Sequence, residues 1–332
     1  MDHAKRQKKS ETILEVLRNR SKKGLDFARK TVSEEQVICG ILREALEYYV
    51  LDWKDFTHPG LFSIASEAVG GDPDKNVEVQ AAIAMIAAAL DIHDDLIDGS
   101  RTKHGRPTVF GKYGQGVSLI LGDVFLVCGF TLLDETSASF PKRRRMEISK
   151  TYRSLLLKLG NAHALELNLK GKMSIVPNEY MQILEMKAAS AEADMRIGAI
   201  VGKGTDVEVE ALTKYGRNIG MLLTLREEFI DLFEVQELSH RMKEECIPIP
   251  LQYCLQDEES KIRLQELLGK RRLTQDNVNE LVDIVLEAKS VKGLKKTMGD
   301  LVQGSISILA KVKGSETKTI LRNLPLATLE DL

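Results

Sequence analysis

Apolar residues recur at helical spacing along almost the whole chain, and this periodicity constrains the fold more than any other feature. In residues 33–53, Val37, Ile41 and Ala45 lie four residues apart, and Ser33 with two glutamates behind it is typical of a helix start. The same spacing recurs in residues 81–98, 117–134, 143–170, 178–203, 208–236, 246–256, 261–268, 276–288 and 292–312. Strand-like alternation never lasts more than a few residues. We expect a single-domain, all-α helical bundle of roughly ten to thirteen helices around a central cavity.

One predicted helix has no polar face over its first ten residues, 81–90. A helix that is apolar on all sides is buried, so we place it at the centre of the bundle. Most of its side chains are alanine, and two interpretations remain open: a deep apolar tunnel beside the helix, or close packing of neighbouring helices against it. In the tunnel interpretation, Ile86, Ala89 and Leu90 form the wall.

The charge balance and the cysteines exclude several classes of protein. The 332 residues include 47 Lys and Arg against 49 Asp and Glu, which argues against a nucleic-acid partner. The longest apolar run, 81–90, is too short to cross a bilayer, so we expect no stable membrane insertion. The four cysteines form no CxxC pair and no signal peptide is apparent, which predicts a reduced, cytoplasmic chain. Residues 1–30 are basic and amphipathic; an interfacial anchor and a frayed first helix both remain open, and we favour the helix.

Three carboxylates, Asp94, Asp95 and Asp98, close the central helix. Residues four apart on a helix differ by only about 40° in azimuth and about 6 Å along the axis, so Asp94 and Asp98 point the same way and repel. Divalent cations would neutralise them, and oxygen ligands suit Mg²⁺. A solvated helix end, terminated by Gly99 and Ser100, is the alternative.

A second cluster repeats this spacing in Glu227, Glu228 and Asp231, again behind an apolar helix. Two such clusters facing each other across a cavity, with Mg²⁺ between them, would form a receptacle for a diphosphate. The metal would neutralise the charge that grows on a departing diphosphate, and an apolar wall would hold the tail of the substrate.

Basic residues follow the first cluster and also occur elsewhere in the chain. Arg101, Lys103 and His104 come within two turns of it. Lys187 precedes a pair of alanines in a predicted helix. If this lysine faced the core, it would need an anionic partner, whereas a lysine that faces water needs none. From the residues alone we favour the water-facing orientation.

The chain resembles the trans-isoprenyl diphosphate synthases, the polyprenyl synthetase family. The resemblance runs from about residue 36 nearly to the end, through HPGLFSIASEAVGG, LDIHDDLIDGS, GRPTVFGKYG, LGDVFL, EYMQILEMKAAS, GAIVG and YGRNIGMLLTLREEFID. It implies a bundle of the isoprenoid synthase type, with residues 31–332 as the prenyltransferase domain behind an N-terminal helix or arm, 1–30. It also implies a homodimer.

The resemblance further implies roles for individual residues. The two clusters would hold about two or three Mg²⁺ ions per site. Lys103 and Lys187 would hold the diphosphate of an allylic prenyl substrate and assist its departure. The released pyrophosphate would act as the base, and Arg101 and His104 would contact substrate.

The departures from the family pattern gather on the side of the second substrate. Where the family has a basic stretch, this chain has only Lys54 and His58 that could bind the second substrate. The allylic and metal side is largely kept, although the second cluster begins with two glutamates instead of two aspartates. A later Lys-Thr pair is also replaced, by Cys246 and Pro248. Each lost charge-assisted hydrogen bond is worth roughly 1.5–3 kcal/mol, so isopentenyl diphosphate would bind weakly.

Three functional hypotheses follow from this pattern. We favour an enzyme that couples a long allylic prenyl diphosphate to a non-standard acceptor, such as dimethylallyl diphosphate or a neutral prenyl compound. The second hypothesis is a non-catalytic or regulatory subunit that pairs with a true polyprenyl diphosphate synthase. The third, a terpene cyclase, is disfavoured because the nearest metal frame has Gly220 where the first ligand should stand.

Overall fold

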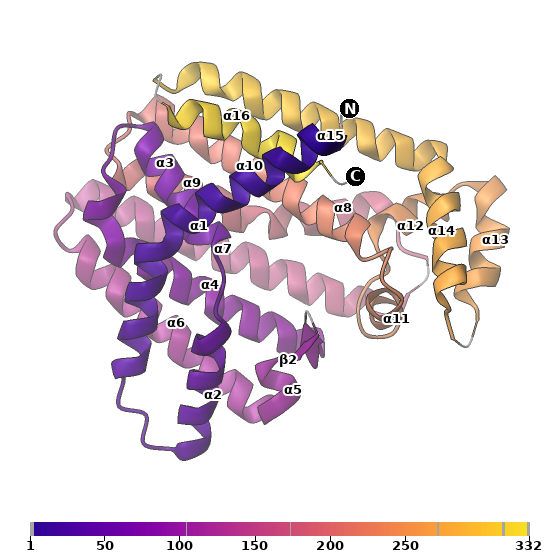
Figure 1. The fold of residues 1–332 in the computed structure, drawn as a ribbon, viewed down its shortest axis with the longest axis horizontal. Coiled ribbons are helices and arrows are strands. Elements are labelled where there is room, and N and C mark those ends of the chain that lie inside the picture. Colours follow the sequence, from indigo (N-terminus) through magenta and orange to yellow (C-terminus); the bar gives the residue numbers. More distant parts are fainter. Residues whose placement is uncertain (1–2, 104, 173, 271, 314–315, 331–332) are drawn as a thin grey trace.

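The computed structural model describes residues 3–103, 105–172, 174–270, 272–313 and 316–330, and almost all of them are helical (Figure 1). The all-α class is confirmed. The first helices are α1 His3–Glu34, α2 Gly40–Asp52, α3 Thr57–Ala68, α4 Val77–Ile97, α5 Val109–Tyr113, α6 Gln115–Ser137, α7 Lys142–Leu169 and α8 Pro177–Lys187. They are followed by α9 Ala189–Val201, α10 Asp206–Ile230, α11 Val235–Glu244, α12 Ile249–Cys254, α13 Glu258–Leu268, α14 Gln275–Glu287, α15 Lys289–Ile308 and α16 Thr317–Thr328.

Three short elements join these helices. Two are 3-10 turns, at Pro73–Asn76 and Leu309–Lys311. The third is a hairpin of two-residue strands, β1 Thr102–Lys103 and β2 Arg106–Pro107, paired antiparallel directly after α4. The hairpin turns the chain back toward the end of α4 and so brings Lys103 beside the aspartates of that helix.

Helix α4 is the central helix, as its composition predicted. Its side chains from Val79 to Ala89 are buried except for Ala87, and it packs most extensively against α6. The two helices approach so closely that a Cβ at Gly129 of α6 would stand 2.8 Å from Ile86. Alanines and glycines at this crossing therefore serve close helix packing.

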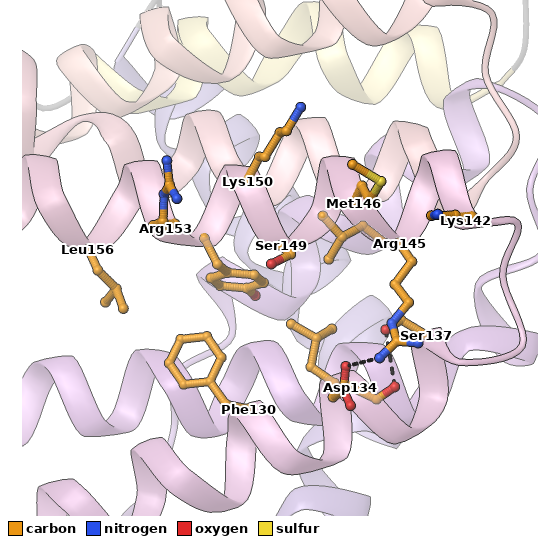
Figure 2. A pocket seen from close by; sticks show the side chains of 13 residues that line it. Phe130, Asp134, Ser137, Lys142, Arg145, Met146, Ser149, Lys150, Arg153 and Leu156 are labelled. Carbon is orange, nitrogen blue, oxygen red and sulfur yellow. Dashed lines mark hydrogen bonds and ion pairs between the residues drawn. The ribbon is translucent and has the colours of Figure 1, made fainter.

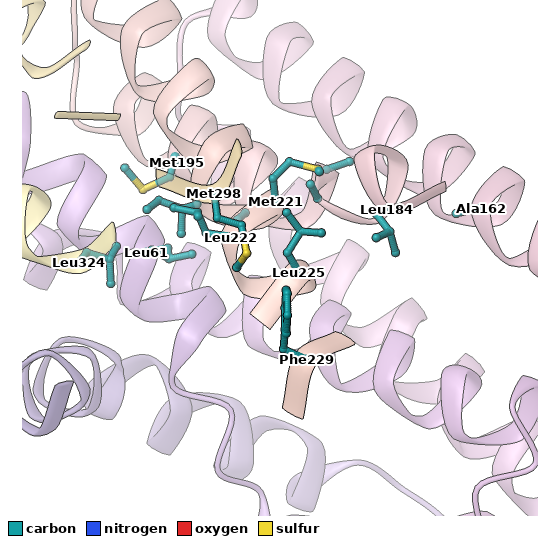
Figure 3. Close-up of a cluster of buried hydrophobic side chains, with 14 of the residues drawn as sticks. Leu61, Ala162, Leu184, Met195, Met221, Leu222, Leu225, Phe229, Met298 and Leu324 are labelled. Atoms are coloured by element: carbon teal, nitrogen blue, oxygen red, sulfur yellow. The ribbon is translucent and has the colours of Figure 1, made fainter. Parts of the chain in front are cut away.

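The largest apolar cluster extends from α4 across the bundle to α9 and α10, which pack together. Figure 3 shows Met195, Leu222, Leu225 and Phe229 from these helices among side chains of α3, α8, α15 and α16. A capping box starts α10: the Thr205 hydroxyl accepts from the backbone N–H of Glu208, whose carboxylate accepts from the Thr205 N–H in return. Helix α10 is thereby fixed at its start and carries the second acidic cluster at its end.

Several helix boundaries differ from the prediction. Ser33 lies in the last turn of α1, and α2 begins only at Gly40, so the predicted helix start at Ser33 is wrong. The predicted helix 178–203 is broken at Ala188, where α10 approaches closely: a Cβ at Gly220 would stand 2.4 Å from the Ala188 carbonyl oxygen. The break ends α8 at Lys187, which lines the cavity described below.

The N-terminal segment from His3 onward forms α1, which packs against α3, α4 and α16 (Figure 1). Leu17, Leu25, Ala28 and Val32 are buried there. The helix runs through residue 30, where the sequence placed the end of an N-terminal arm; the division into arm and catalytic domain stays a prediction.

Helix α6 is long and apolar enough to cross a membrane by length and composition alone, which the sequence reading did not identify. A third of its most apolar window is buried inside the chain, mainly against α4. Leu119, Ile120 and Val127 lie on its exposed side. Core helices of other proteins have the same composition, so α6 is only weak evidence for a membrane span. That the chain has no stable membrane insertion stays a prediction.

Candidate active site

A cavity of about 920 Å³ opens among α2, α3, α4, α7, α8, α9, α10 and the hairpin. It brings together many of the residues singled out in the sequence. These are Lys54, His58, Ile86, Leu90, Asp94, Asp95, Lys103, Lys187 and Glu227. Asp98, Arg101, Ala89, Glu228 and Asp231 do not line it.

The first acidic cluster stands at the C-terminal end of α4, where the helix dipole already disfavours negative charge. The Oδ1 atom of Asp94 is buried without a hydrogen-bond partner among the described residues; Nδ1 of His163 lies 3.5 Å away. Burial raises the pKa of Asp98 to about 7, and the Asp94 carboxylate adds to the rise. Carboxylate oxygens that lack a hydrogen bond in this way fit a hard divalent cation such as Mg²⁺.

Lys103 is the nearest counter-charge to this cluster. Its ammonium lies 2.6 Å from Oδ1 of Asp91 and 3.5 Å from Oδ1 of Asp95. Burial raises the pKa of Asp95 to about 7 although Lys103 opposes the rise. Asp91 extends the acidic face of α4 by a turn, and the i, i+4 spacing to Asp95 was the signal for it in the sequence.

Lys187 points inward from the end of α8, against the water-facing orientation favoured from the residues alone. Its ammonium is 2.6 Å from Oε2 of Glu166 on α7. Burial disfavours the charged ammonium, but the Glu166 carboxylate outweighs it and raises the pKa of Lys187. Glu166 also accepts a hydrogen bond of 3.2 Å from the Tyr180 hydroxyl. Neither Glu166 nor His163 was identified from the sequence.

The second acidic cluster is divided between two faces of α10. Successive helical residues point about 100° apart, and Glu227 lines the cavity, 61% exposed, while Glu228 is buried. Glu228 and Asp231 both bind the buried guanidinium of Arg241 on α11. The expected arrangement, with all three carboxylates facing the cavity, is therefore not found, and Glu228 and Asp231 do not fit a divalent ion.

Among the described residues, no three carboxylate, imidazole or thiolate groups converge at metal distance. Mg²⁺ is commonly held by one or two carboxylates together with waters and phosphate oxygens of a substrate. The side of the cavity formed by Asp94 fits that pattern.

The cations on the side of the predicted second substrate are already paired with carboxylates. Nδ1 of His58 lies 2.6 Å from Oδ2 of the buried Asp194 on α9. Burial alone would lower the pKa of His58, but Asp194 and then Asp55 raise it to about 10. Lys54 and Arg106 both pair with Asp52. Asp194 was not identified from the sequence.

The remaining predicted residues lie elsewhere. The guanidinium of Arg101 stacks on the ring of Phe110, 4.7 Å from its centroid, outside the cavity lining. Ala89 is fully buried in a cluster that includes Phe125, so it is not a wall residue of this cavity. His104 lies outside the described residues.

Relatives and solved structures agree on one family. The chain is 27% identical over 226 residues to the short chain isoprenyl diphosphate synthase of Methanothermobacter thermautotrophicus, covering 68% of each protein. It is 22% identical over 237 residues to the geranylgeranyl diphosphate synthase of Sulfolobus acidocaldarius, covering 68% of this chain and 71% of that protein.

Among solved structures, geranylgeranyl pyrophosphate synthetase from Pyrococcus horikoshii has the same fold, with a TM-score of 0.82 and 22% identity over 95% of this chain and 97% of that one. The sequence model of the family described as polyprenyl synthetase matches residues 40–285, well over half of the chain. The chain thus belongs to the polyprenyl synthetase family of prenyl-transferring enzymes.

Proposed function

We propose that the protein ionises an allylic prenyl diphosphate and couples the prenyl group to a non-standard acceptor. The observation that carries this proposal is the change in polarity along the cavity. Asp94 and His163 lie together, and on both of their helices the lining turns apolar toward lower residue numbers, through Ile86 and Ile83 on α4 and Leu159 and Leu155 on α7. Ile83 lies eleven residues before Asp94, about 16 Å of helix. A diphosphate at the acidic end would place its tail along these walls.

Each part of the cavity has a role in this reaction. Lys187 and Lys103 exchange their present carboxylate partners for diphosphate oxygens and so stabilise the leaving group. Mg²⁺, held by Asp94 with Asp98 beside it, would neutralise charge on the departing diphosphate. The apolar walls keep water from the allylic cation until the acceptor attacks. The released pyrophosphate takes the proton that the acceptor loses.

The ion pairs on the acceptor side of the cavity support an acceptor other than isopentenyl diphosphate. A diphosphate bound there would have to break the pair of His58 with Asp194, or the pairs of Lys54 and Arg106 with Asp52. Each of those exchanges trades one charge-assisted contact for another and gains little. Neutral prenyl compounds need no such cations and are therefore the favoured acceptors. Dimethylallyl diphosphate carries the same diphosphate as isopentenyl diphosphate and meets the same obstacle, so it is the second candidate.

Mass spectrometry of products tests the proposal directly. The purified protein is incubated with Mg²⁺, an allylic prenyl diphosphate, and in turn isopentenyl diphosphate, dimethylallyl diphosphate or a neutral prenyl alcohol. Coupling with one of the last two, abolished in Asp94→Asn, is the expected result. Efficient turnover of isopentenyl diphosphate at low micromolar concentration would contradict the non-standard acceptor.

The length of the prenyl chain depends on where the cavity closes. Tyr152 lines this cavity and also a second hollow of about 660 Å³ between α6 and α7, where its ring stands 5.7 Å from that of Phe130. Figure 2 shows the second hollow, with Phe130 and Leu156 at one part and Arg145 with Asp134 at another. We infer a long chain, with Ile86 and Leu90 as wall residues and Tyr152 as the barrier between the two hollows.

The alternative, a non-catalytic subunit of a heteromeric synthase, is favoured by one observation: two of the three carboxylates of the second cluster are held by Arg241. The buried Oδ1 atom of Asp94 argues against it: this atom has no hydrogen-bond partner among the described residues, and such an atom is costly unless a ligand binds it. If the pure protein showed no turnover and a second synthase restored activity, the subunit hypothesis would be favoured.

The cytoplasmic location stays a prediction.

We also propose a homodimer through the exposed apolar side of α6. Leu119, Ile120 and Val127 are 48%, 53% and 63% exposed on a helix that otherwise packs into the bundle. Val127→Glu is expected to convert the dimer to a monomer in sedimentation experiments. The matched control is Ile262→Glu on α13, which removes an equally exposed apolar residue far from α6 in the sequence. A monomeric parent protein would contradict the proposal.

A further inference from the structure

The buried guanidinium of Arg241 makes several polar contacts beside the second acidic cluster. It comes from α11, is 6% exposed, and meets three carboxylates: Oε1 of Glu228 at 2.8 Å, Oε2 of Glu245 at 3.1 Å, and Asp231. Two neutral groups complete its surroundings. Its Nε donates to the Cys246 carbonyl at 2.9 Å, and Nη2 donates to the Tyr180 hydroxyl at 3.1 Å.

The carboxylates of the second cluster are engaged in turn. Oε1 of Glu228 accepts from Arg241, and Oε2 accepts from the backbone N–H of Ile249 at 2.7 Å. Oδ2 of Asp231 accepts from Arg241 as well. Three of the four oxygens of these two side chains are therefore used inside the protein.

This arrangement gives the second cluster a built-in cation. Glu228 and Asp231 are three residues apart and share a helix face, so one planar guanidinium reaches both of them. A metal ion at this place would have to displace a buried arginine and would leave the Tyr180 hydroxyl and the Cys246 carbonyl without their present donor. At the first cluster, by contrast, Oδ1 of Asp94 has no hydrogen-bond partner in the described part of the chain.

We infer that the guanidinium of Arg241 takes the place of a divalent metal ion between Glu228 and Asp231. Of the second cluster, Glu227 alone then faces the cavity, and metal binding is concentrated on the side of Asp94 and Asp98. The protein then binds fewer metal ions than a site with two open clusters. This inference rests on the proposed function, because it concerns the metal ions that accompany a diphosphate in the same cavity.

Binding of Mn²⁺ tests the inference without any turnover. Free Mn²⁺ is measured by electron paramagnetic resonance during titration of the full-length protein saturated with inorganic pyrophosphate. Asp98→Asn and Asp231→Asn form a matched pair, since each removes one charge and keeps an acceptor oxygen. We expect Asp98→Asn to weaken Mn²⁺ binding at least about tenfold. Asp231→Asn should bind Mn²⁺ like the parent protein.

A third variant, Arg241→Gln, should bind at least one additional Mn²⁺, because it removes the cation that holds Oε1 of Glu228 and Oδ2 of Asp231. If it fails to fold, the matched pair decides alone. Loss of Mn²⁺ affinity in Asp231→Asn as large as in Asp98→Asn would overturn the inference, as would a folded Arg241→Gln with no extra Mn²⁺. Absence of Mn²⁺ binding to the parent protein with pyrophosphate would instead overturn the proposed function on which the inference rests.

Discussion

The pair of His58 with the buried carboxylate of Asp194 makes a prediction that is independent of catalysis. The pKa of His58 is raised from 6.5 to about 10, so the imidazole is charged at pH 7 in the folded protein and largely neutral in the unfolded chain. At about 1.4 kcal/mol per pH unit, this gap corresponds to at most roughly 5 kcal/mol. Burial of the Asp194 carboxylate, which raises its own pKa, offsets part of that. We expect Asp194→Asn to lower the free energy of unfolding at pH 7 by about 2–3 kcal/mol.

The sign of the pH dependence follows from the raised pKa of His58. A group with a folded pKa above its unfolded value contributes its full stability below the unfolded pKa and loses it as the pH rises through the folded pKa. The difference between the parent protein and Asp194→Asn should therefore shrink between pH 6.5 and about 10. Urea unfolding at several pH values measures it, and NMR titration of the imidazole protons follows His58 itself.

Asp123→Asn provides the matched control, because Asp123 also lies beside a histidine, 3.4 Å from Nε2 of His93, but is 61% exposed. An exposed pair contributes about 1 kcal/mol or less. If His58 titrated near 6.5 in the parent protein, or if Asp194→Asn cost no more than Asp123→Asn, the assignment of a charged His58 paired with Asp194 would be refuted.

Three further predictions concern chain length and the scaffold. Ala87→Phe fills the cavity and should shorten the products seen by mass spectrometry. Ala89→Phe should leave the products unchanged and lower the free energy of unfolding by about 1–3 kcal/mol through overpacking. Shorter products from Ala89→Phe and unchanged products from Ala87→Phe would contradict the cavity lining. Tyr152→Ala should lengthen the products by joining the two hollows, and an unchanged product distribution would count against that barrier. Thr205→Ala removes the capping box of α10 and should cost about 1 kcal/mol in urea unfolding; no change would mean that the cap contributes nothing.

Most of the fold and the first cluster could be predicted from the sequence because the relevant signals are local. Helical spacing identified the long helices, and the apolar composition of α4 identified the centre of the bundle. Asp94 and Lys103 lie only nine residues apart, and a single hairpin brings the lysine back to the end of α4. Local patterns of this kind determine the nearby structure with little dependence on the rest of the chain.

The pairs that distinguish this cavity join distant parts of the chain, and no local pattern contains them. Asp194 is 136 residues from His58, and nothing near Asp194 in the sequence indicates that its carboxylate meets a histidine. The break at Ala188, which ends α8 at Lys187, coincides with the close approach of Gly220 from α10. Such contacts depend on how helices cross, which helical periodicity does not specify.

The two acidic clusters have the same spacing but different surroundings, and the surroundings decide what each can bind. On α4 the carboxylates end the helix beside a cavity, and Oδ1 of Asp94 is left without a hydrogen bond among the described residues. On α10 the chain continues into α11, and one of its residues, Arg241, returns to the same helix face as Glu228 and Asp231. A repeated motif therefore predicts a shared ligand only when neighbouring elements leave both copies free, and here Arg241 leaves only Glu227 of the second copy facing the cavity.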